Sequence, residues 1–244
     1  MNEELFAKLA SNKKYGDVHP DAIRRAIAEC EGRYKKPKDL EKAVRERLHG
    51  VTSAFNDLKR VKLSDDLESL LACHASSRER LPLGRMDTLY HRIFEITGAP
   101  ESVLDLACGL NPLYLLRCYP ACPVTGVDVS RSCIELLSGE PNFSGHWADL
   151  LSADSVPQEH FHIALLFKIL PLLERQSPGA ATELMERVDA EYLAISFPTR
   201  TLGGRNVGME KNYSEWMEAH IPLKRCVAAR FADENELFYV LKEN

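Results

Sequence analysis

Hydrophobic residues follow two different spacings along the chain, and the change falls near residue 101. In residues 1–97 they recur with the period of an amphipathic helix. Proline at a first helical position, serine as an N-cap and glycine as a stop mark the helix ends. The predicted helices run from Pro20 to Gly32, from Pro37 to Gly50, onward from Ser64, and over Met86–Ile96 to Gly98. Short helices with short links predict an all-helical bundle domain over residues 1–97.

In residues 98–244 short apolar runs of strand type alternate with helical patterns. The predicted strands are Val103–Ala107, Pro123–Asp128, Phe143–Ala148, His162–Phe167, Tyr192–Phe197, Cys226–Phe231 and Leu237–Leu241. Helices are predicted from Pro112, from Ser130 as an N-cap, over Ala180–Val188 and over Asn212–Ala219. Such alternation implies parallel strands in a doubly wound sheet, and the last two strands form an antiparallel hairpin. We therefore predict an α/β, Rossmann-like domain with seven strands over residues 98–244.

The turn after the first predicted strand has the features of a ligand-binding turn. Gly109 can adopt a positive φ, and Pro112 suits the first position of the next helix. The turn lacks the G-x-G-x-x-G pattern of dinucleotide-binding proteins, which argues against NAD or FAD. It is closer to the D/E-x-G-x-G-x-G motif of S-adenosylmethionine-dependent methyltransferases, with Asp105, Ala107, Gly109 and Asn111 in that frame. On its own, an ordinary strand-to-helix turn explains the pattern equally well.

Acidic residues at three consecutive strand ends favour a bound adenosine. Ligands of open α/β sheets bind beyond the carboxyl ends of the strands. There Asp128 could accept hydrogen bonds from ribose hydroxyls, and Asp149 from the adenine amino group, while Asp105 could balance a cationic methionine end. The candidate cofactor-binding residues are Asp105, Ala107, Gly109, Asn111, Asp128, Val129, Asp149, Leu150, Phe167 and Lys168. The set predicts S-adenosyl-L-methionine as the cofactor.

Composition is that of a globular protein, with 45% hydrophobic and 27% charged residues. Apolar runs are too short to cross a membrane, and the N-terminus lacks a secretory signal, so we expect a cytoplasmic protein. The seven cysteines are scattered without a C-x-x-C pair, and the eight histidines form no ligand cluster. Neither a disulfide framework nor a metal site is expected.

Charge is distributed unevenly along the chain. The formal net charge is −5, yet residues 1–62 carry 15 Lys and Arg against 10 Asp and Glu. A basic N-terminal segment on an acidic body is typical of an arm that docks on nucleic acid. A solvated helical face with surplus lysine accounts for the same asymmetry.

Seven runs in chain order resemble the aminoglycoside-resistance 16S ribosomal RNA methyltransferases, which modify N7 of guanine 1405 in the decoding site. The runs are Lys13–Tyr15, Arg45–Gly50, His74–Leu81, Asp87–Tyr90, Leu104–Pro112, Phe167–Arg175 and Ser196–Arg205, which continues to Gly208–Glu210. In that family the turn A-C-G-L-N-P is itself the usual form. The resemblance implies a class I methyltransferase body and a helical N-terminal domain that docks on the 30S subunit. We expect a monomer.

The resemblance also implies roles for particular residues. His74 and Arg80 would lie near the methionine end of the cofactor, and the loop Ser196–Arg205 would lie beside the target base. Phosphate contacts are expected from Lys13, Lys14, Arg24, Arg25, Lys35, Lys36 and Lys38.

Methylation of guanine N7 requires no general base, because that nitrogen carries a lone pair and no proton. We therefore expect no catalytic acid or base, only positioning. Phe197 could stack on the base, with Arg200 and Arg205 on flanking phosphates; equally, Phe197 could be core and both arginines could face solvent. The alternative interpretations are a methyltransferase for another RNA or a small molecule, a nicotinamide-dependent oxidoreductase, and a non-catalytic RNA-binding module.

Overall fold

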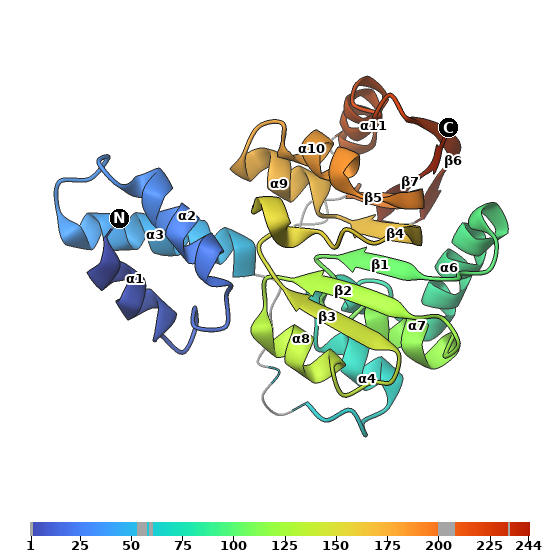
Figure 1. The fold of residues 1–244 in the computed structure, drawn as a ribbon, viewed down its shortest axis with the longest axis horizontal. Coiled ribbons are helices and arrows are strands. Elements are labelled where there is room, and N and C mark those ends of the chain that lie inside the picture. The colour runs from blue at the N-terminus through green and yellow to red at the C-terminus, as the bar shows by residue number, and fades with distance from the viewer. Residues whose placement is uncertain (1, 53–57, 59–60, 200–207, 234) are drawn as a thin grey trace.

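The computed structural model describes residues 2–52, 58, 61–199, 208–233 and 235–244. A lobe of three helices at the N-terminus lies beside a seven-stranded sheet with helices on both faces (Figure 1). The seven-stranded α/β fold predicted from the sequence is therefore confirmed.

The N-terminal lobe consists of α1 (Glu3–Ala10), α2 (Pro20–Cys30) and α3 (Pro37–Thr52). Apolar faces of all three helices enclose a separate core that includes Leu5, Leu9, Ile23, Ile27, Val44 and Leu48. Helix α2 begins at Pro20 as predicted. Helix α3 continues through Gly50, so the predicted stop there was wrong: a glycine inside a helix costs only about 1 kcal/mol, which the buried face of α3 offsets.

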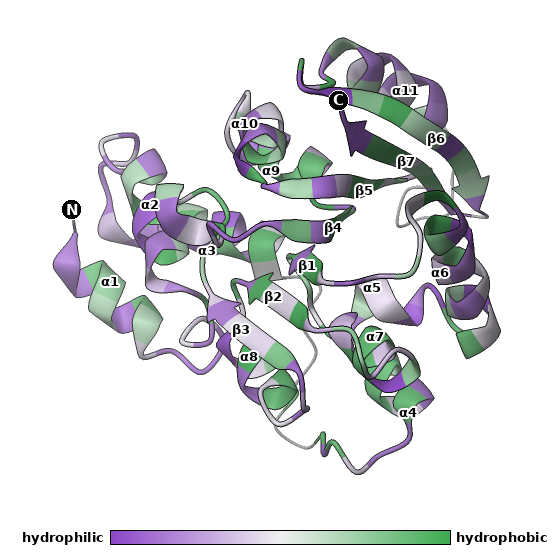
Figure 2. Ribbon diagram, turned by 45° about the vertical axis from the view of Figure 1, so that its right-hand side comes forward, coloured by the Kyte–Doolittle hydropathy of each residue, from purple (hydrophilic) through white to green (hydrophobic). Residues whose placement is uncertain are grey.

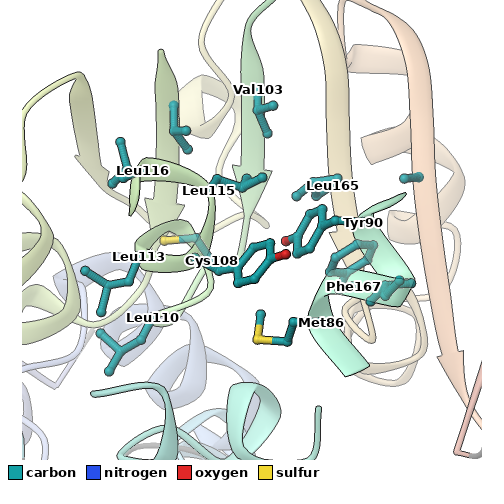
Figure 3. Packing of buried hydrophobic residues seen from close by; sticks show 14 of the residues in the cluster. Met86, Tyr90, Val103, Cys108, Leu110, Leu113, Leu115, Leu116, Leu165 and Phe167 are labelled. Atoms are coloured by element: carbon teal, nitrogen blue, oxygen red, sulfur yellow. The ribbon is translucent and has the colours of Figure 1, made fainter. Parts of the chain in front are cut away.

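Helices α4 (Leu67–Ala72), α5 (Ala75–Arg78) and α6 (Leu83–Thr97) follow. Figure 3 shows Met86 and Tyr90 of α6 beside Leu165 and Phe167 of the sheet, in one core. The core of residues 5–48 is thus separate from the one that α4 and α6 share with the sheet. The expected domain boundary at residues 97 and 98 stays a prediction. The predicted N-cap Ser64 was wrong, because the side chain of Asp66 accepts from the Ser69 N–H instead.

The sheet has the strand order β3-β2-β1-β4-β5-β7-β6. Its strands are β1 (Val103–Leu106), β2 (Val124–Asp128), β3 (Phe143–Trp147), β4 (Phe161–Phe167), β5 (Ala190–Pro198), β6 (Arg225–Asp233) and β7 (Glu236–Glu243). Strands β1 to β5 are parallel, and β7 pairs antiparallel with β5 and β6. The predicted hairpin is confirmed, but it is tighter than expected because Asp233 pairs with Glu236.

Helices cover both faces of the sheet. Helices α7 (Pro112–Cys118) and α8 (Arg131–Leu137) share one core with α4 and α6, and α8 has the predicted N-cap Ser130. The opposite core contains α9 (Leu170–Gln176), α10 (Ala180–Arg187) and α11 (Met209–Ala219), of which α9 was not predicted. A short 3-10 turn, Ala153–Ser155, follows β3. In Figure 2 hydrophobic and hydrophilic residues alternate around these helices, as amphipathic packing requires.

Strand β1 lies between β2 and β4, so the direction of winding reverses beside it. The carboxyl ends of the parallel strands β1, β2 and β3 open at one edge of the sheet. Ligands of open α/β sheets bind in the crevice at such a reversal point.

Candidate functional site

The turn between β1 and α7 has the backbone of a ligand-binding turn. Ala107 and Gly109 have positive φ angles of 57° and 52°. For alanine this conformation costs on the order of 1–3 kcal/mol, and such strain gathers at functional sites. The predicted helix start at Pro112 is confirmed. The turn therefore lies at the carboxyl end of β1, where the crevice of the sheet opens.

The imidazole of His74 lies directly against this turn. A Cβ atom built on Gly109 would come within 2.4 Å of the His74 ring. Burial, and then the positive charges of Arg80 and Arg78, lower the pKa of His74 to about 4. His74 is therefore neutral at pH 7 and lies beside the turn; its place near the methionine end of the cofactor stays a prediction.

Replacing Gly109 by alanine tests how tightly the turn is built. The new Cβ would meet the buried His74 ring at a backbone φ that favours glycine. We expect Gly109→Ala to lower the free energy of unfolding by roughly 2 kcal/mol or more. The control is Gly50→Ala, since nothing lies within 4 Å of its Cβ position. Chemical denaturation of both variants measures the difference in their free energies of unfolding. Equal values would mean that the turn can rearrange to accommodate the added methyl group.

Asp128 at the end of β2 is bonded to the same turn. Its Oδ2 accepts from the Gly109 N–H and its Oδ1 from the Ser130 N–H, both at 2.8 Å. Burial raises the pKa of Asp128 to about 6, although these two backbone hydrogen bonds oppose the rise. A carboxylate has about four acceptor positions, so two remain for the hydroxyls of a ligand. This donor set fits a ribose.

Asp105 forms a buried hydrogen-bonded chain behind the turn. The Asn111 amide donates to Asp105 Oδ2 at 2.6 Å, and the Tyr90 hydroxyl donates to Asn111 Oδ1 at 2.9 Å. Burial raises the pKa of Asp105 to about 8. A cationic ligand group at this position would favour the ionised carboxylate, which fits the ammonium or sulfonium of a methionine end.

Arg80 is held by a carboxylate that the sequence interpretation missed. Its Nε and Nη2 donate to the two oxygens of Glu236 at 3.0 and 2.8 Å, and both side chains are buried. Lys168 Nζ lies 3.1 Å from Glu236 and also pairs with Glu79, and Ser196 Oγ donates to Glu236 at 2.7 Å. Although burial raises the pKa of Glu236, the charges of Arg80 and Lys168 outweigh it and hold the pKa at about 2.

This cluster joins the ends of β4, β5 and β7. The Arg80 guanidinium also lies 4.5 Å from the centre of the Phe167 ring. Arg80, Phe167 and Lys168, all of which were predicted to bind the cofactor, are therefore neighbours. A role for any of them in holding the cofactor stays a prediction.

Asp149 at the end of β3 binds an arginine of the N-terminal lobe. Arg25 Nε and Nη2 donate to Asp149 Oδ2 at 3.1 and 2.9 Å, and Arg25 Nη1 donates to Gln176 at 3.0 Å. Arg25 was predicted to contact RNA phosphate; its guanidinium instead pairs with this carboxylate here, and the phosphate contact stays a prediction. Leu150 is buried in the core under α9 and α10, and Val129 packs against the core of the N-terminal lobe.

A cavity of about 990 Å³ opens beside Lys168, between α9 and α11. Phe197 lies in its wall, but only 1% of the residue is exposed, and its ring stacks on Tyr213 with centroids 5.0 Å apart. The prediction that Phe197 stacks on a base was therefore wrong, because the side chain belongs to the core. Tyr213 and Trp216 of α11 are half-buried in the same wall and were missed, although their spacing on one helix face was visible in the sequence. Arg200 and Arg205 lie outside the described residues.

The other predicted phosphate contacts lie on the surface of the N-terminal lobe. Lys13, Lys14, Lys35, Lys36 and Lys38 are exposed, and so is Arg24, which pairs with Asp21 at 3.1 Å. A groove of about 490 Å³ between the α1–α2 loop and α3 is lined by Lys14, Tyr15, Lys38, Glu41, Lys42, Arg45, Glu46 and His49. Lys42 adds positive charge that the sequence interpretation did not assign to this surface, whereas Arg45 is paired with Glu41 at 2.8 Å.

The part of the chain that the structure describes contains no group of three His, Cys, Asp or Glu residues arranged to hold a metal ion. Within the same residues, no helix is both long enough and apolar enough to span a bilayer.

Comparison with known proteins gives consistent matches. The family described as "Ribosomal RNA methyltransferase (FmrO)" matches residues 11–240. A 16S rRNA (guanine(1405)-N(7))-methyltransferase of Serratia marcescens is 38% identical over 255 residues, covering 100% of this chain and 99% of that protein. One from Frankia casuarinae is 31% identical over 261 residues, covering 96% of this chain and 91% of that protein.

Solved structures show the same similarity over the whole chain. The 16S rRNA methyltransferase RmtF, in complex with S-adenosyl-L-homocysteine, aligns with a TM-score of 0.86 and 39% identity, covering 99% of this chain and 98% of that one. The 16S rRNA methylase RmtB aligns with a TM-score of 0.81 and 32% identity, with the same coverage.

Proposed function

The chain belongs to the ribosomal RNA methyltransferase (FmrO) family, and we propose that it transfers a methyl group from S-adenosyl-L-methionine to N7 of guanine 1405 of 16S ribosomal RNA. Membership of this family decides against the nicotinamide-dependent oxidoreductase and against a non-catalytic binding module. We propose that it works in the cytoplasm on the 30S subunit, and that it acts as a monomer. Methylation there gives the host resistance to aminoglycosides.

The observation that carries the proposal is the row of carboxylates at consecutive strand ends. Asp105 and Asp128 are tied to one another through the Gly109 turn, and Asp149 follows on the next strand. In this proposal the free acceptor positions of Asp128 take the ribose hydroxyls, Asp149 accepts from the adenine amino group, and Asp105 balances the charge of the methionine end. When bound, S-adenosyl-L-methionine supplies a methyl group already activated on a sulfonium.

The chain's own residues then have to position the base rather than move protons. Guanine N7 attacks with a lone pair, so no side chain has to remove a proton. The cavity beside Lys168 is bordered by the ends of β4 and β5, with Tyr213 and Trp216 half-buried in its wall. We assign it to the target guanine, which has to leave its stack at a cost of a few kcal/mol. Holding N7 in line with the methyl group accounts for the rate enhancement. Arg200 and Arg205 would hold the flanking phosphates.

The exposed lysines of the N-terminal lobe dock the enzyme on ribosomal RNA. Reversing charge with Lys13→Glu and Lys14→Glu together should weaken binding to 30S subunits at least about tenfold at low salt, because each phosphate contact contributes about one unit of the log–log salt slope. Both side chains are exposed, so S-adenosylhomocysteine should bind unchanged.

Filter binding at several salt concentrations measures the affinity and the slope. The control is Lys224→Glu on the loop before β6, which should leave subunit binding intact. If the double variant instead lost S-adenosylhomocysteine binding, the segment would be structural.

Mapping the methylated nucleotide tests the proposed function. The enzyme is incubated with purified 30S subunits and tritiated cofactor, and the labelled nucleotide is located by primer extension after N7-specific cleavage. We expect label at guanine 1405 in subunits and much less in free 16S RNA. Label at another nucleotide, or on free RNA or a metabolite alone, would overturn it.

A further inference from the structure

Residues 17–25 of the N-terminal lobe are bonded to the loops that follow β2 and β3. We propose that this segment is one wall of the adenosine site, and that Arg25 is the positioning residue that aims Asp149 at the adenine amino group. The inference rests on the proposed function, because it takes the strand-end carboxylates as the cofactor's partners. It gives Arg25, a residue of the N-terminal lobe, a part in the specificity of the cofactor site.

The loop after β2 is held by the first part of the segment. Asp17 Oδ2 accepts from the Ser130 hydroxyl at 2.6 Å, and Asp17 Oδ1 accepts from the Ser132 N–H at 2.8 Å. The His19 N–H donates to the Val129 carbonyl at 2.9 Å. These bonds fix the backbone directly after Asp128, whose own Oδ1 accepts from the Ser130 N–H.

The loop after β3 is held by Arg25. A guanidinium is a rigid fork of donors, so two hydrogen bonds to one carboxylate restrict the orientation of that carboxylate. Here Nε and Nη2 both reach Asp149 Oδ2, while Nη1 is anchored on Gln176 of α9. The Asp149 side chain is 8% exposed and that of Arg25 24%. The pair is therefore largely shielded from solvent screening.

This arrangement leaves the second oxygen of Asp149 for a ligand. Oδ1 accepts one long hydrogen bond, from the Leu151 N–H at 3.3 Å. With Oδ2 taken by Arg25, an adenine amino group is directed to Oδ1. Without Arg25 the carboxylate could rotate and would lose its charged partner, so the hydrogen bond to the amino group would weaken.

The competing explanation is that the Arg25–Asp149 ion pair only holds the N-terminal lobe against the sheet. The selectivity of the enzyme among cofactor analogues distinguishes this explanation from the positioning role. A structural pair would affect all cofactor analogues equally. A positioning pair affects only those that carry the 6-amino group. The probes are S-adenosylhomocysteine and its analogue whose purine lacks that amino group, each titrated by calorimetry into the full-length enzyme.

We expect the wild type to bind S-adenosylhomocysteine about tenfold or more tightly than the analogue, as a hydrogen bond to a charged acceptor implies. Arg25→Gln should reduce this preference to about threefold or less, as should Asp149→Asn. The double variant should show no further reduction beyond Asp149→Asn alone, because both changes remove one interaction. Arg33→Gln, an exposed arginine of the same lobe, is the matched control and should keep the wild-type preference.

If Arg25→Gln keeps the wild-type preference, or weakens both ligands by the same factor, the pair is structural and the inference is overturned. A wild type that binds S-adenosylhomocysteine without any preference overturns it too, while leaving the proposed function intact. A wild type that binds neither ligand defeats the proposed function itself. Thermal unfolding shows whether Arg25→Gln is folded. If it is not, Arg25→Lys replaces it, because a single ammonium keeps the charge but cannot make both hydrogen bonds of the guanidinium. Arg25→Lys should lower the preference in part.

Discussion

Asp128→Ala should reduce the affinity for S-adenosylhomocysteine by roughly a hundredfold or more and abolish methylation of 30S subunits at ordinary cofactor concentrations. Two hydroxyl hydrogen bonds to an ionised acceptor are lost, each contributing about 1.5–3 kcal/mol. The change also leaves the N–H groups of Gly109 and Ser130 without their acceptor, which loosens the turn between β1 and α7. Calorimetry with the purified variant measures the affinity.

Asp154→Ala is the control for this experiment. Asp154 lies in the short turn after β3 and is exposed, so its removal should leave affinity unchanged. Circular dichroism verifies that both variants are folded. An Asp128→Ala enzyme that binds S-adenosylhomocysteine like the wild type would show that the ribose lies elsewhere.

Glu236→Gln should lower the free energy of unfolding by roughly 3 kcal/mol near pH 7. The substitution keeps the shape of the side chain but leaves the buried guanidinium of Arg80 without its carboxylate, and Lys168 keeps only its pair with Glu79. Breaking one partner of a buried ion pair typically costs about 3–5 kcal/mol. Urea denaturation measures the loss. The control is Glu215→Gln, whose exposed pair with Lys211 should contribute almost nothing.

The same pair predicts the direction of a pH effect. The folded protein holds the pKa of Glu236 at about 2, below its ordinary value of 4.5. Its stabilising contribution is therefore present above pH 4.5 and is lost as the pH falls toward 2. The difference between wild type and Glu236→Gln should shrink over that window. A difference that stays constant from pH 7 to pH 3 would mean that Glu236 does not carry the charge that binds Arg80.

The strands and the turn after β1 could be predicted from sequence because their signals are local. A short apolar run followed by Gly109 and Pro112 is enough to identify a strand, a turn and a helix start. The placement of Asp128 then follows, because parallel strands put their carboxyl ends at one edge of the sheet. Helix ends were less secure: Gly50 lies inside α3, and Asp66 replaces Ser64 as N-cap.

The ion pairs of the site could not be predicted, because their partners are far apart in the chain. Arg25 and Asp149 are separated by 124 residues, and Arg80 and Glu236 by 156. An isolated arginine on an amphipathic helix looks the same in sequence whether it meets a phosphate or a carboxylate. The burial of Phe197, in contrast, could have been predicted. Phe197 lies on the same face of β5 as Ile195, and both belong to one core. The alternation of side chains along that strand therefore already favoured a buried ring.

The central claim is that the strand-end carboxylates bind the adenosine of the cofactor, and a crystal structure of this enzyme with S-adenosylhomocysteine tests it most directly. We predict the ribose hydroxyls on Asp128, the adenine amino group on Asp149 Oδ1 and the methionine end at the Gly109 turn. A ligand bound at another part of the molecule, or with its adenosine turned away from Asp128 and Asp149, would contradict the account.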